Sequence, residues 1–290
     1  FSADQVDLNF KNPEVLFEFI RIIRKYLKKG VRIIRLDAIA FLWKEAGTSC
    51  IHLTETHEIV KLLRLVIENL EPTAIIITET NVPVRENLSY FGNDNEAHLI
   101  YNFSLPPLLV HALISGNCKH LKTWMISMPP ARLGRAYLNF IASHDGIGIR
   151  PTEGLFNEKT LKNFLKRLKK NGSKFSYRKI QNKSKKVYEA NITVYDALKK
   201  SDTDPNGKFF LERYIAAHAI MISFEGIPAV YFNSLFGKAN DEAKYVITGN
   251  NRDVNRYKWN HKNITKKLRD KNSKQSIFYQ NLGKLLEIRR

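Results

Sequence analysis

The segment Val31–Phe41 reads VRIIRLDAIAF and places two full charges, on Arg35 and Asp37, inside an otherwise apolar run. A short run rich in valine, isoleucine and leucine is typical of a strand buried on both faces, as in a parallel sheet covered by helices. Side chains two positions apart on a strand share a face, so Arg35 and Asp37 are predicted to point the same way. Buried charges are costly unless each has a partner. The pair is therefore either a structural ion pair at a strand end or part of a functional site.

On either side of this segment, short apolar runs alternate with amphipathic runs. We expect strands in VRIIRLDA, TAIIITET, HLIYNF, RAYLNFIASHD and IPAVYF. We expect helices in PEVLFEFIRIIRKYLKKG, HEIVKLLRLVIENLEP, PPLLVHALISG and FLERYIAAHAIMISFEG. Strands that alternate with helices indicate a parallel sheet. The pattern predicts an α/β fold, a partial (β/α)8 TIM barrel in which about five strands can be recognised.

The chain is predicted to be organised in four parts. Residues 1–149 hold barrel strands with their helices, and residues 150–208 interrupt the alternation with a basic helix and a strand-like piece. This second part is expected to be a small subdomain inserted after a barrel strand, on the face where such barrels carry their sites. Residues 209–259 hold the last barrel helix, the last strand and an active-site loop, and residues 260–290 form a C-terminal helical region.

The composition indicates a folded globular chain, with 290 residues of which 43% are hydrophobic and 26% charged. The formal charge of +19 could indicate a nucleic-acid partner, but no nucleic-acid-binding motif accompanies it. The excess lies in lysine-rich polar stretches that are more simply a solvated surface. No apolar run is long enough to suggest a membrane span. We therefore expect neither nucleic acid nor a membrane as a partner.

The two cysteines, Cys50 and Cys118, lack the spacing of metal ligands and are too few for a disulfide scaffold. We therefore expect no metal site and a reducing, cytoplasmic compartment. Phe1 is not an initiator methionine, and no signal segment leads the chain. The sequence is expected to begin inside a longer one.

Three carboxylates follow apolar runs that are predicted to be strands. Asp37 ends the first run, Glu79 ends TAIIITET, and Asp145 ends LNFIASHD beside His144. A single acid at a strand end is more often a helix cap or an ion pair. Three of them at successive strand ends favour a site, because those ends converge on one pocket in a barrel.

Converging carboxylates suit chemistry at an acetal carbon. One carboxylate, kept ionised by a cation such as Arg35, can attack the anomeric carbon. A second, held protonated, can give its proton to the leaving oxygen. In a retaining reaction these two lie about 5–5.5 Å apart and a covalent sugar intermediate forms. A third can hold sugar hydroxyls and stabilise the developing positive charge.

Four short segments resemble, in order, conserved regions of the α-amylase superfamily, glycoside hydrolase family 13: QVDLN, VRIIRLDAI, IIITETN and FIASHDGIG. The resemblance implies that Asp37 is the nucleophile, Glu79 the general acid/base and Asp145 the transition-state stabiliser. It also implies that Arg35 and His144 bind the donor sugar.

Longer motifs resemble the sucrose phosphorylase branch of that family: RLDAIAFLWKEAGTSC, YNFSLPPLLVHALISG, HDGIGIRPTEG, NITVYDAL and NNRDVNR. FLWKE and IRPTEG are most similar to the glucosylglycerate phosphorylases of the branch. The resemblance implies retaining α-glucosyl transfer by double displacement, with phosphorolysis of 2-O-α-glucosylglycerate to α-D-glucose 1-phosphate. Inorganic phosphate is then a co-substrate, no cofactor is expected, and a homodimer is possible.

One conserved region of the family, which follows the third strand, is absent from this sequence. The recognisable strands are therefore expected to be about strands 4–8 of the barrel, with the subdomain inserted after strand 7. Other activities remain open: sucrose or glucosylglycerol phosphorolysis, and hydrolysis of α-glucans or oligosaccharides. A non-catalytic sugar-binding homologue is a further alternative.

Two groups of basic residues are candidates for substrate contacts. Arg252 and Arg256 lie in the loop that closes over the donor pocket in this branch, and Arg256 is the better candidate to reach Asp145; the alternative is a basic surface loop. Arg150 and Tyr188 are candidates for binding an anionic acceptor such as phosphate or glycerate. Lys185 and Lys186 are further candidates at the acceptor, or belong to the general surface excess.

Overall fold

The computed structural model describes residues 6–179 and 185–290. Gln5 of the QVDLN motif and residues 180–184 of the lysine-rich stretch lie outside the described residues. The chain divides into two compact units. The first comprises the residues up to Tyr101 together with Ala131–Tyr137, and the second comprises Asn102–Pro130 and Leu138–Arg290.

Parallel strands form the centre of the first unit. β1 (Ile33–Leu36) pairs with β2 (Ile75–Thr78), and β2 pairs with β3 (Leu99–Tyr101). The strand β4 (Ala136–Asn139) begins in this unit, where the Ala136 N–H donates to the His98 carbonyl at 2.9 Å. All four segments were expected to be strands, and this prediction is confirmed.

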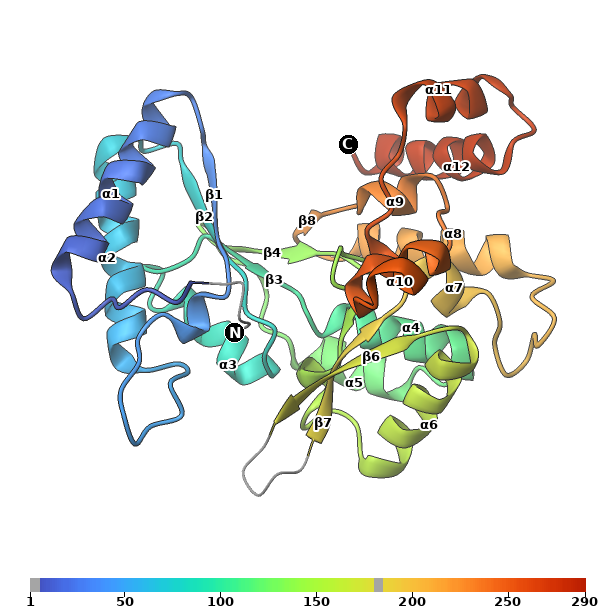
Figure 1. The fold of residues 1–290 in the computed structure, drawn as a ribbon, viewed down its shortest axis with the longest axis horizontal. Helices are drawn as coiled ribbons and strands as arrows, with labels where there is room; N and C mark the ends of the chain where they lie inside the picture. Colours follow the sequence, from blue (N-terminus) through green and yellow to red (C-terminus); the bar gives the residue numbers. More distant parts are fainter. Residues whose placement is uncertain (1–5, 180–184) are drawn as a thin grey trace. The chain divides into compact units, whose positions relative to one another are not determined.

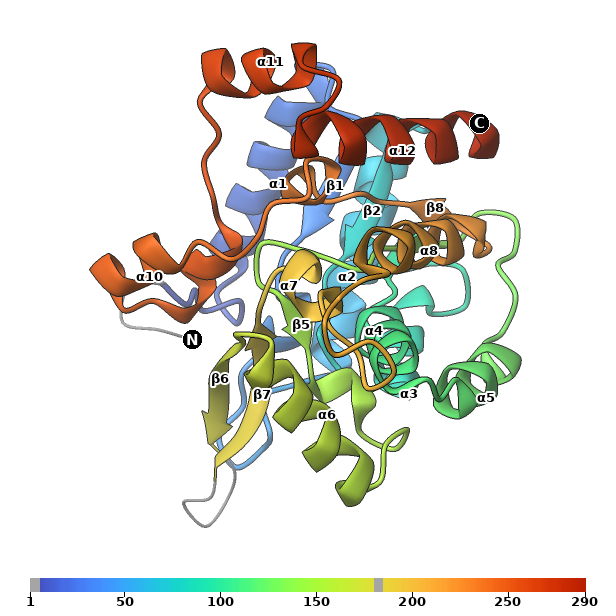
Figure 2. The ribbon, with the colours of Figure 1, turned by 90° about the vertical axis from the view of Figure 1, so that its right-hand side faces the viewer.

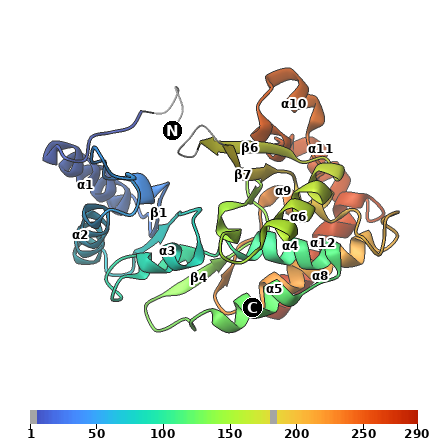
Figure 3. The ribbon, with the colours of Figure 1, turned by 90° about the horizontal axis from the view of Figure 1, so that it is seen from below.

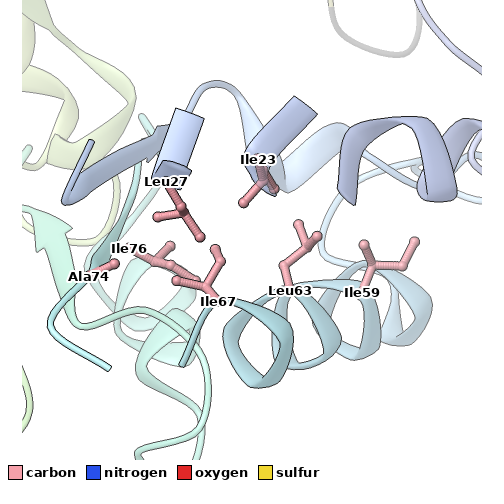
Figure 4. Close-up of a cluster of buried hydrophobic side chains, with 7 residues drawn as sticks. All are labelled: Ile23, Leu27, Ile59, Leu63, Ile67, Ala74 and Ile76. Carbon is pink, nitrogen blue, oxygen red and sulfur yellow. The ribbon is translucent and has the colours of Figure 1, made fainter. Parts of the chain in front are cut away.

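Two long helices, α1 (Pro13–Lys28) and α2 (Thr54–Leu70), lie side by side against β1 and β2 (Figure 1). Asn12 caps α1 by accepting the Glu14 N–H, and Pro13 opens the helix where no N–H partner is needed. The apolar faces of α1 and α2 meet the inner face of β2 in one buried cluster (Figure 4). Full burial of one such aliphatic side chain contributes about 1.5–3 kcal/mol. The cluster consists of Ile23, Leu27, Ile59, Leu63, Ile67, Ala74 and Ile76.

The expectation that the first strand is buried on both faces is wrong. Ile33 is 58% exposed, and exposed and half-buried residues alternate along β1. Within the described residues β1 pairs on one side only, with β2. Because β1 has one paired edge and helices cover one of its faces, its other face stays exposed to solvent even though most of its residues are apolar.

Short helices complete the first unit: the 3-10 helices η1 (Ile39–Phe41) and η2 (Ser89–Phe91), and the α-helix α3 (Val84–Leu88). η1 follows Asp37 directly, and α3 follows the segment that carries Glu79. The polypeptide therefore turns sharply after each of these two acids.

In the second unit β4 pairs in parallel with β8 (Ile227–Pro228). Both strands are shorter than the sequence indicated. β4 ends at Asn139, so Asp145 lies in a loop rather than at the last position of a strand. The apolar run IPAVYF yields only the two residues of β8, because its end turns into the helix α9 (Phe232–Leu235). Apolar composition is shared by strands and buried turns, so it overestimates strand length.

Among the described residues, a second sheet is antiparallel and has three strands, two of them within the expected subdomain of residues 150–208 and one just before it. Its order is β5 (Ile147–Gly148), β7 (Lys185–Asn191), β6 (Lys174–Lys179), and the β6–β7 hairpin is visible in Figure 3. The strand β7 and the basic helix α6 (Glu158–Lys170) were expected. The strand β6, KFSYRK, was not expected, because only two aromatic residues, Phe175 and Tyr177, alternate with its basic and polar residues.

Helices make up the rest of the second unit. The helix α12 (Lys274–Arg289) packs on α8 (Phe210–Ser223), as Figure 2 shows, and it also contacts α9. The remaining helices are η3 (Arg150–Thr152), η5 (Asn251–Asn255), α4 (Leu105–Ser115), α5 (Lys119–Ser127), α7 (Val194–Leu198), α10 (Glu242–Thr248) and α11 (His261–Arg269). In residues 6–179 and 185–290, no helix combines the length and apolarity that a membrane crossing needs.

Candidate active site

The ends of β1 and β2 bring two of the predicted acids side by side. Arg35 pairs with Ile77 across the ladder, and the Glu79 N–H donates to the Leu36 carbonyl at 3.0 Å. Continuing this register by one step sets Asp37 beside Glu79. Paired residues of parallel strands share a face, so both carboxylates belong to the face that carries Arg35.

Arg35 is the centre of the polar contacts in this cluster. Its Nη1 donates to Asp37 Oδ1 at 2.5 Å, and its Nε donates to the Tyr101 hydroxyl at 3.1 Å. Burial lowers the pKa of Arg35, but Tyr101, Asp37 and Glu79 raise it to a net value above the ordinary one. Arg35 therefore carries its positive charge at any physiological pH.

The carboxylate of Asp37 is accessible within the first unit. The Asp37 side chain is 66% exposed and that of Arg35 is about one-third exposed. An ion pair this accessible contributes little to folding stability. An exposed carboxylate held by a fixed cation is better explained by a role at a site than by a role in the core.

Glu79 holds the backbone just after Asp37. Its Oε2 accepts the Ala38 N–H at 3.0 Å, and Ala38 adopts a left-handed conformation with φ of 48°. That conformation costs a non-glycine residue roughly 1–2 kcal/mol. The hydrogen bond to Glu79 helps to offset this strain. The two acids are therefore coupled through the turn as well as through the sheet.

Tyr101 was not predicted as a site residue. It ends β3, and its carbonyl accepts the Asn87 Nδ2–H at 2.8 Å while its hydroxyl meets Arg35. The only signal in the sequence was its place at the end of HLIYNF, a predicted strand. A tyrosine at a strand end is too common for that signal to stand out.

In the second unit, Asp145 is held by the predicted arginine. Arg256 Nη2 donates to Asp145 Oδ1 at 2.8 Å, and Arg256 Nε donates to the His144 carbonyl at 3.2 Å. His144 Nε2 lies 3.5 Å from Asp145 Oδ2, and half of the His144 side chain is exposed. The expected contact of Arg256 with Asp145 is present, and Arg256 does not lie in a detached surface loop.

Arg252 has a different main partner, Glu189, which was not predicted as a site residue. Arg252 Nε donates to Glu189 Oε2 at 3.0 Å, and Nη2 donates to Oε1 at 2.6 Å. Its Nη1 lies 3.4 Å from Asp145 Oδ1. Burial lowers the pKa of Arg252, but the hydrogen bonds and charge of Glu189 and the charge of Asp145 raise it above its ordinary value. Burial raises the pKa of Glu189, while Arg252 acts in the opposite direction.

The side chain of Asn191 connects Glu189 to the loop of Asp145. Its Nδ2 donates to the Asp145 carbonyl at 2.8 Å and to Glu189 Oε2 at 3.3 Å. β5 and β7 also pair here, with Gly148 opposite Glu189. The loop of Asp145 is therefore attached to the antiparallel sheet by both side-chain and ladder hydrogen bonds.

The predicted acceptor residues are spread along the same part of the chain. Arg150 opens η3 and is half-buried, and Tyr188 is half-buried in β7, where its carbonyl accepts the Ile149 N–H at 2.9 Å. Lys185 and Lys186 are exposed at the start of β7, which favours the reading that they belong to the general surface. The acceptor role of all four stays a prediction.

Asp37 and Glu79 belong to the first unit and Asp145 to the second, so the meeting of all three in one pocket stays a prediction from the fold. In the part of the chain that the structure describes, no group of three histidines, cysteines or acids is arranged to hold a metal ion.

The family model described as "Alpha amylase, catalytic domain" matches residues 1–147. That match includes the ends of β1 and β2 and the His144–Asp145 segment. The chain belongs to the α-amylase family. The resemblance drawn from the four short motifs is thereby confirmed.

Two similar relatives are glucosylglycerate phosphorylases. The chain is 42% identical over 291 residues to that of Escherichia coli (strain K12), covering all of this chain and 52% of that protein. It is 41% identical over 290 residues to that of Spirochaeta thermophila, covering all of this chain and 49% of that protein. The chain thus spans about half the length of the curated relatives it matches.

Among solved structures, the crystal structure of sucrose 6F-phosphate phosphorylase from Thermoanaerobacter thermosaccharolyticum matches with a TM-score of 0.82. The sequence identity is 25%, and the match covers 99% of this chain and 55% of that chain. Together with the parallel strands and their intervening helices, this match establishes an α/β, TIM-barrel-like fold.

Proposed function

We propose that this protein transfers an α-glucosyl group from an α-glucoside to inorganic phosphate, releasing α-D-glucose 1-phosphate, and that the glucoside is 2-O-α-glucosylglycerate. The observation that carries the proposal is the identity of 41–42% over the whole chain to two glucosylglycerate phosphorylases. The identity to sucrose 6F-phosphate phosphorylase is 25%. This contrast favours glycerate over a fructosyl group as the aglycone.

The first half of the reaction forms a glucosyl-enzyme intermediate. Asp37 Oδ attacks the anomeric carbon while the bond from that carbon to the glycerate oxygen breaks, and Glu79 gives its proton to that oxygen. A retaining pair needs carboxyls about 5–5.5 Å apart. Adjacent strands are separated by about 4.8 Å, so neighbouring places past the ends of β1 and β2 suit this pair.

The second half releases the product. A phosphate oxygen attacks the same carbon, the bond to Asp37 breaks, and the Glu79 carboxylate accepts the phosphate proton. Two inversions at one carbon give net retention. Asp145 stabilises the positive charge that develops on the sugar ring in both steps, and Arg35, His144 and Arg256 contact the donor sugar.

The proposal also covers the place of the strands in the barrel, the acceptor side of the site, and the compartment and partners of the protein. The described parallel strands are taken as strands 4–8 of the barrel, with the subdomain of residues 150–208 inserted after strand 7. Arg150 and Tyr188 lie on the acceptor side, where an anionic acceptor needs cations and hydrogen-bond donors. The protein works in the cytoplasm without a cofactor, as a possible homodimer, and has neither nucleic acid nor a membrane as a partner.

The test is an assay of the full-length protein with 2-O-α-glucosylglycerate, glucosylglycerol and sucrose, each with and without inorganic phosphate. We expect α-D-glucose 1-phosphate only when phosphate is present, with kcat/KM for glucosylglycerate at least about tenfold above that for the other donors, a difference of about 1.4 kcal/mol. The anomeric configuration of the product is read by NMR before it mutarotates.

Release of free glucose at the same rate without phosphate would instead identify a hydrolase. Preference for sucrose or glucosylglycerol would keep the phosphorylase chemistry and refute the choice of glycerate. A β-configured product would refute the retaining mechanism.

A further inference from the structure

Glu189 is a buried acid whose charge is matched by one arginine. Glu189 is 2% exposed, and both of its carboxylate oxygens accept hydrogen bonds from N–H groups of Arg252. Acids this buried are retained only where they are paired. Two parallel N–H···O bonds between a guanidinium and a carboxylate fix the arginine in orientation as well as in position.

The geometry of the guanidinium connects this pair to Asp145. Glu189 takes Nε and Nη2 of Arg252, and the third nitrogen, Nη1, lies 3.4 Å from Asp145 Oδ1. Because the guanidinium is planar and rigid, fixing two of its nitrogens determines where the third one points. The Arg252 side chain is 38% exposed, so without Glu189 it could sample many rotamers.

Asp145 Oδ1 thus accepts a hydrogen bond from Arg256 and also lies near the guanidinium of Arg252. Arg256 Nη2 lies 2.8 Å from this oxygen. Both arginines lie beside Oδ1, and Oδ2 has His144 Nε2 at 3.5 Å. The two arginines therefore lie nearest one oxygen of the Asp145 carboxylate, and His144 lies nearest the other.

We propose that Glu189 is a positioning residue of the glucosyl-transfer site, which holds Arg252 so that Nη1 and Arg256 together set the orientation of the Asp145 carboxylate. The inference rests on the proposed function, in which Asp145 stabilises the charge on the sugar ring. Glu189 itself touches neither sugar nor phosphate in this scheme; it acts through Arg252. The antiparallel sheet thereby contributes to catalysis from β7.

The test uses four forms of the full-length protein: wild type, Glu189→Gln, Arg252→Lys and the double variant. Arg252→Lys keeps the charge but cannot make the two parallel bonds. With α-glucosyl fluoride as donor and phosphate as acceptor, we expect Glu189→Gln to lower kcat about 10- to 100-fold, as small misplacements of catalytic groups do. We expect the KM for phosphate to stay within about twofold of the wild-type value. When Glu189→Gln is added to Arg252→Lys, we expect kcat to fall less than about threefold further.

Glu153→Gln is the matched control. Glu153 pairs with Arg178 at 2.5 Å in the same subdomain, and both side chains are partly exposed. Its kcat should stay within about twofold of the wild type. Glu189→Gln could instead lower kcat by the same factor in both backgrounds, in proportion to its loss of thermal stability. Glu189 would then be merely structural, and the inference would be overturned.

The proposed function and the inference can fail separately. Whether the wild type requires phosphate decides the proposed function. The effect of Glu189→Gln in the wild-type and Arg252→Lys backgrounds decides the inference, and it can be measured with water as acceptor if phosphate is not used. If the wild type transfers glucose to neither, a crystal structure of Glu189→Gln decides instead. The inference then requires Arg252 Nη1 to leave Asp145, and an unmoved Arg252 refutes it.

Discussion

Asp37 and Glu79 are neighbours across the β1–β2 ladder, and each accepts a hydrogen bond from a different group. The carboxylate of Asp37 is bound by the guanidinium of Arg35, whereas Glu79 Oε2 accepts a neutral backbone N–H from Ala38. A permanent cation favours a carboxylate that attacks as an anion. The charge of Arg35 also acts on Glu79, which is one of the groups that raise the pKa of Arg35. The contact with Arg35 suits Asp37 to the part of nucleophile in the proposed reaction, and the acid/base role of Glu79 stays a prediction.

These roles predict opposite responses to a donor that needs no proton. Asp37→Asn should lower the transfer rate at least about 10³-fold with every donor, because no covalent intermediate can form. Glu79→Gln should be similarly slow with glucosylglycerate. It should still form the glucosyl-enzyme from α-glucosyl fluoride, whose leaving group needs no proton. Rates and the covalent intermediate can be followed by stopped-flow fluoride release and intact-protein mass spectrometry.

Glu79→Gln keeps a side-chain oxygen for the Ala38 N–H, so the turn after Asp37 should survive in this variant. Equal losses with the fluoride and with glucosylglycerate would show that Glu79 has another role. Near-normal transfer by Asp37→Asn would remove Asp37 from the mechanism.

At the level of elements, the loop of Asp145 packs closely on the antiparallel sheet. Gly146 has φ of 96°, and a Cβ placed there would lie 2.5 Å from the Ala190 carbonyl oxygen and 3.0 Å from Asn191 Cα. Both contacts are with the backbone of β7, which cannot rotate away. The residue after Asp145 must therefore be glycine for β5 and β7 to pair as they do.

Gly146→Ala should consequently lower the free energy of unfolding by more than the strain of a left-handed backbone alone. Gly154 is the matched control, since its φ is 79° and no atom lies within 4 Å of a Cβ built there. Gly154→Ala should destabilise by roughly 1–2 kcal/mol from left-handed strain alone. Gly146→Ala should cost at least about 1 kcal/mol more and lower kcat about tenfold or more. Urea unfolding and the transfer assay measure the two effects, and equal costs for both variants would contradict the close packing.

For the molecule as a whole, three buried histidines are expected to make stability depend on pH on the acid side of neutrality. Burial lowers the pKa values of His98, His111 and His218 to about 4. The unfolded chain takes up these protons near pH 6.5, whereas the folded protein does not. The contribution of each histidine is therefore fully present above pH 6.5 and is lost as the pH falls from about 6.5 to 4.

We therefore expect the free energy of unfolding to fall with pH in this window, by up to about 1.4 kcal/mol per pH unit for each histidine. Glu189 and Asp196, whose pKa values are raised by burial, act with the opposite sign. His98 Nδ1 accepts the Ile76 N–H at 3.0 Å, so His98→Asn can retain an acceptor without titrating. Urea unfolding at about pH 7, 6 and 5 should show a shallower dependence for this variant. An unchanged slope would exclude His98 as a contributor.

The sequence by itself determined the alternation of strands and helices, the family, and the position of Asp37 and Glu79 one residue beyond β1 and β2. These features are local. Hydrophobic periodicity and an acid directly after an apolar run are both encoded within about ten residues, so they can be recognised without knowing where the chain returns. Strand lengths were less accessible: β4 and β8 are short because their apolar runs continue into turns.

Only the tertiary structure decided which charges pair. Arg252 binds Glu189 across 63 residues of sequence, and Arg256 binds Asp145 across 111. The chain contains 47 basic and 28 acidic residues, so composition and local pattern leave many pairings open. The register of β5 with β7 sets Glu189 beside the Asp145 loop and selects one partner for each arginine. Ion pairs of this kind follow from packing and strand pairing, and for that reason Glu189 could not be recognised before the sheet was seen.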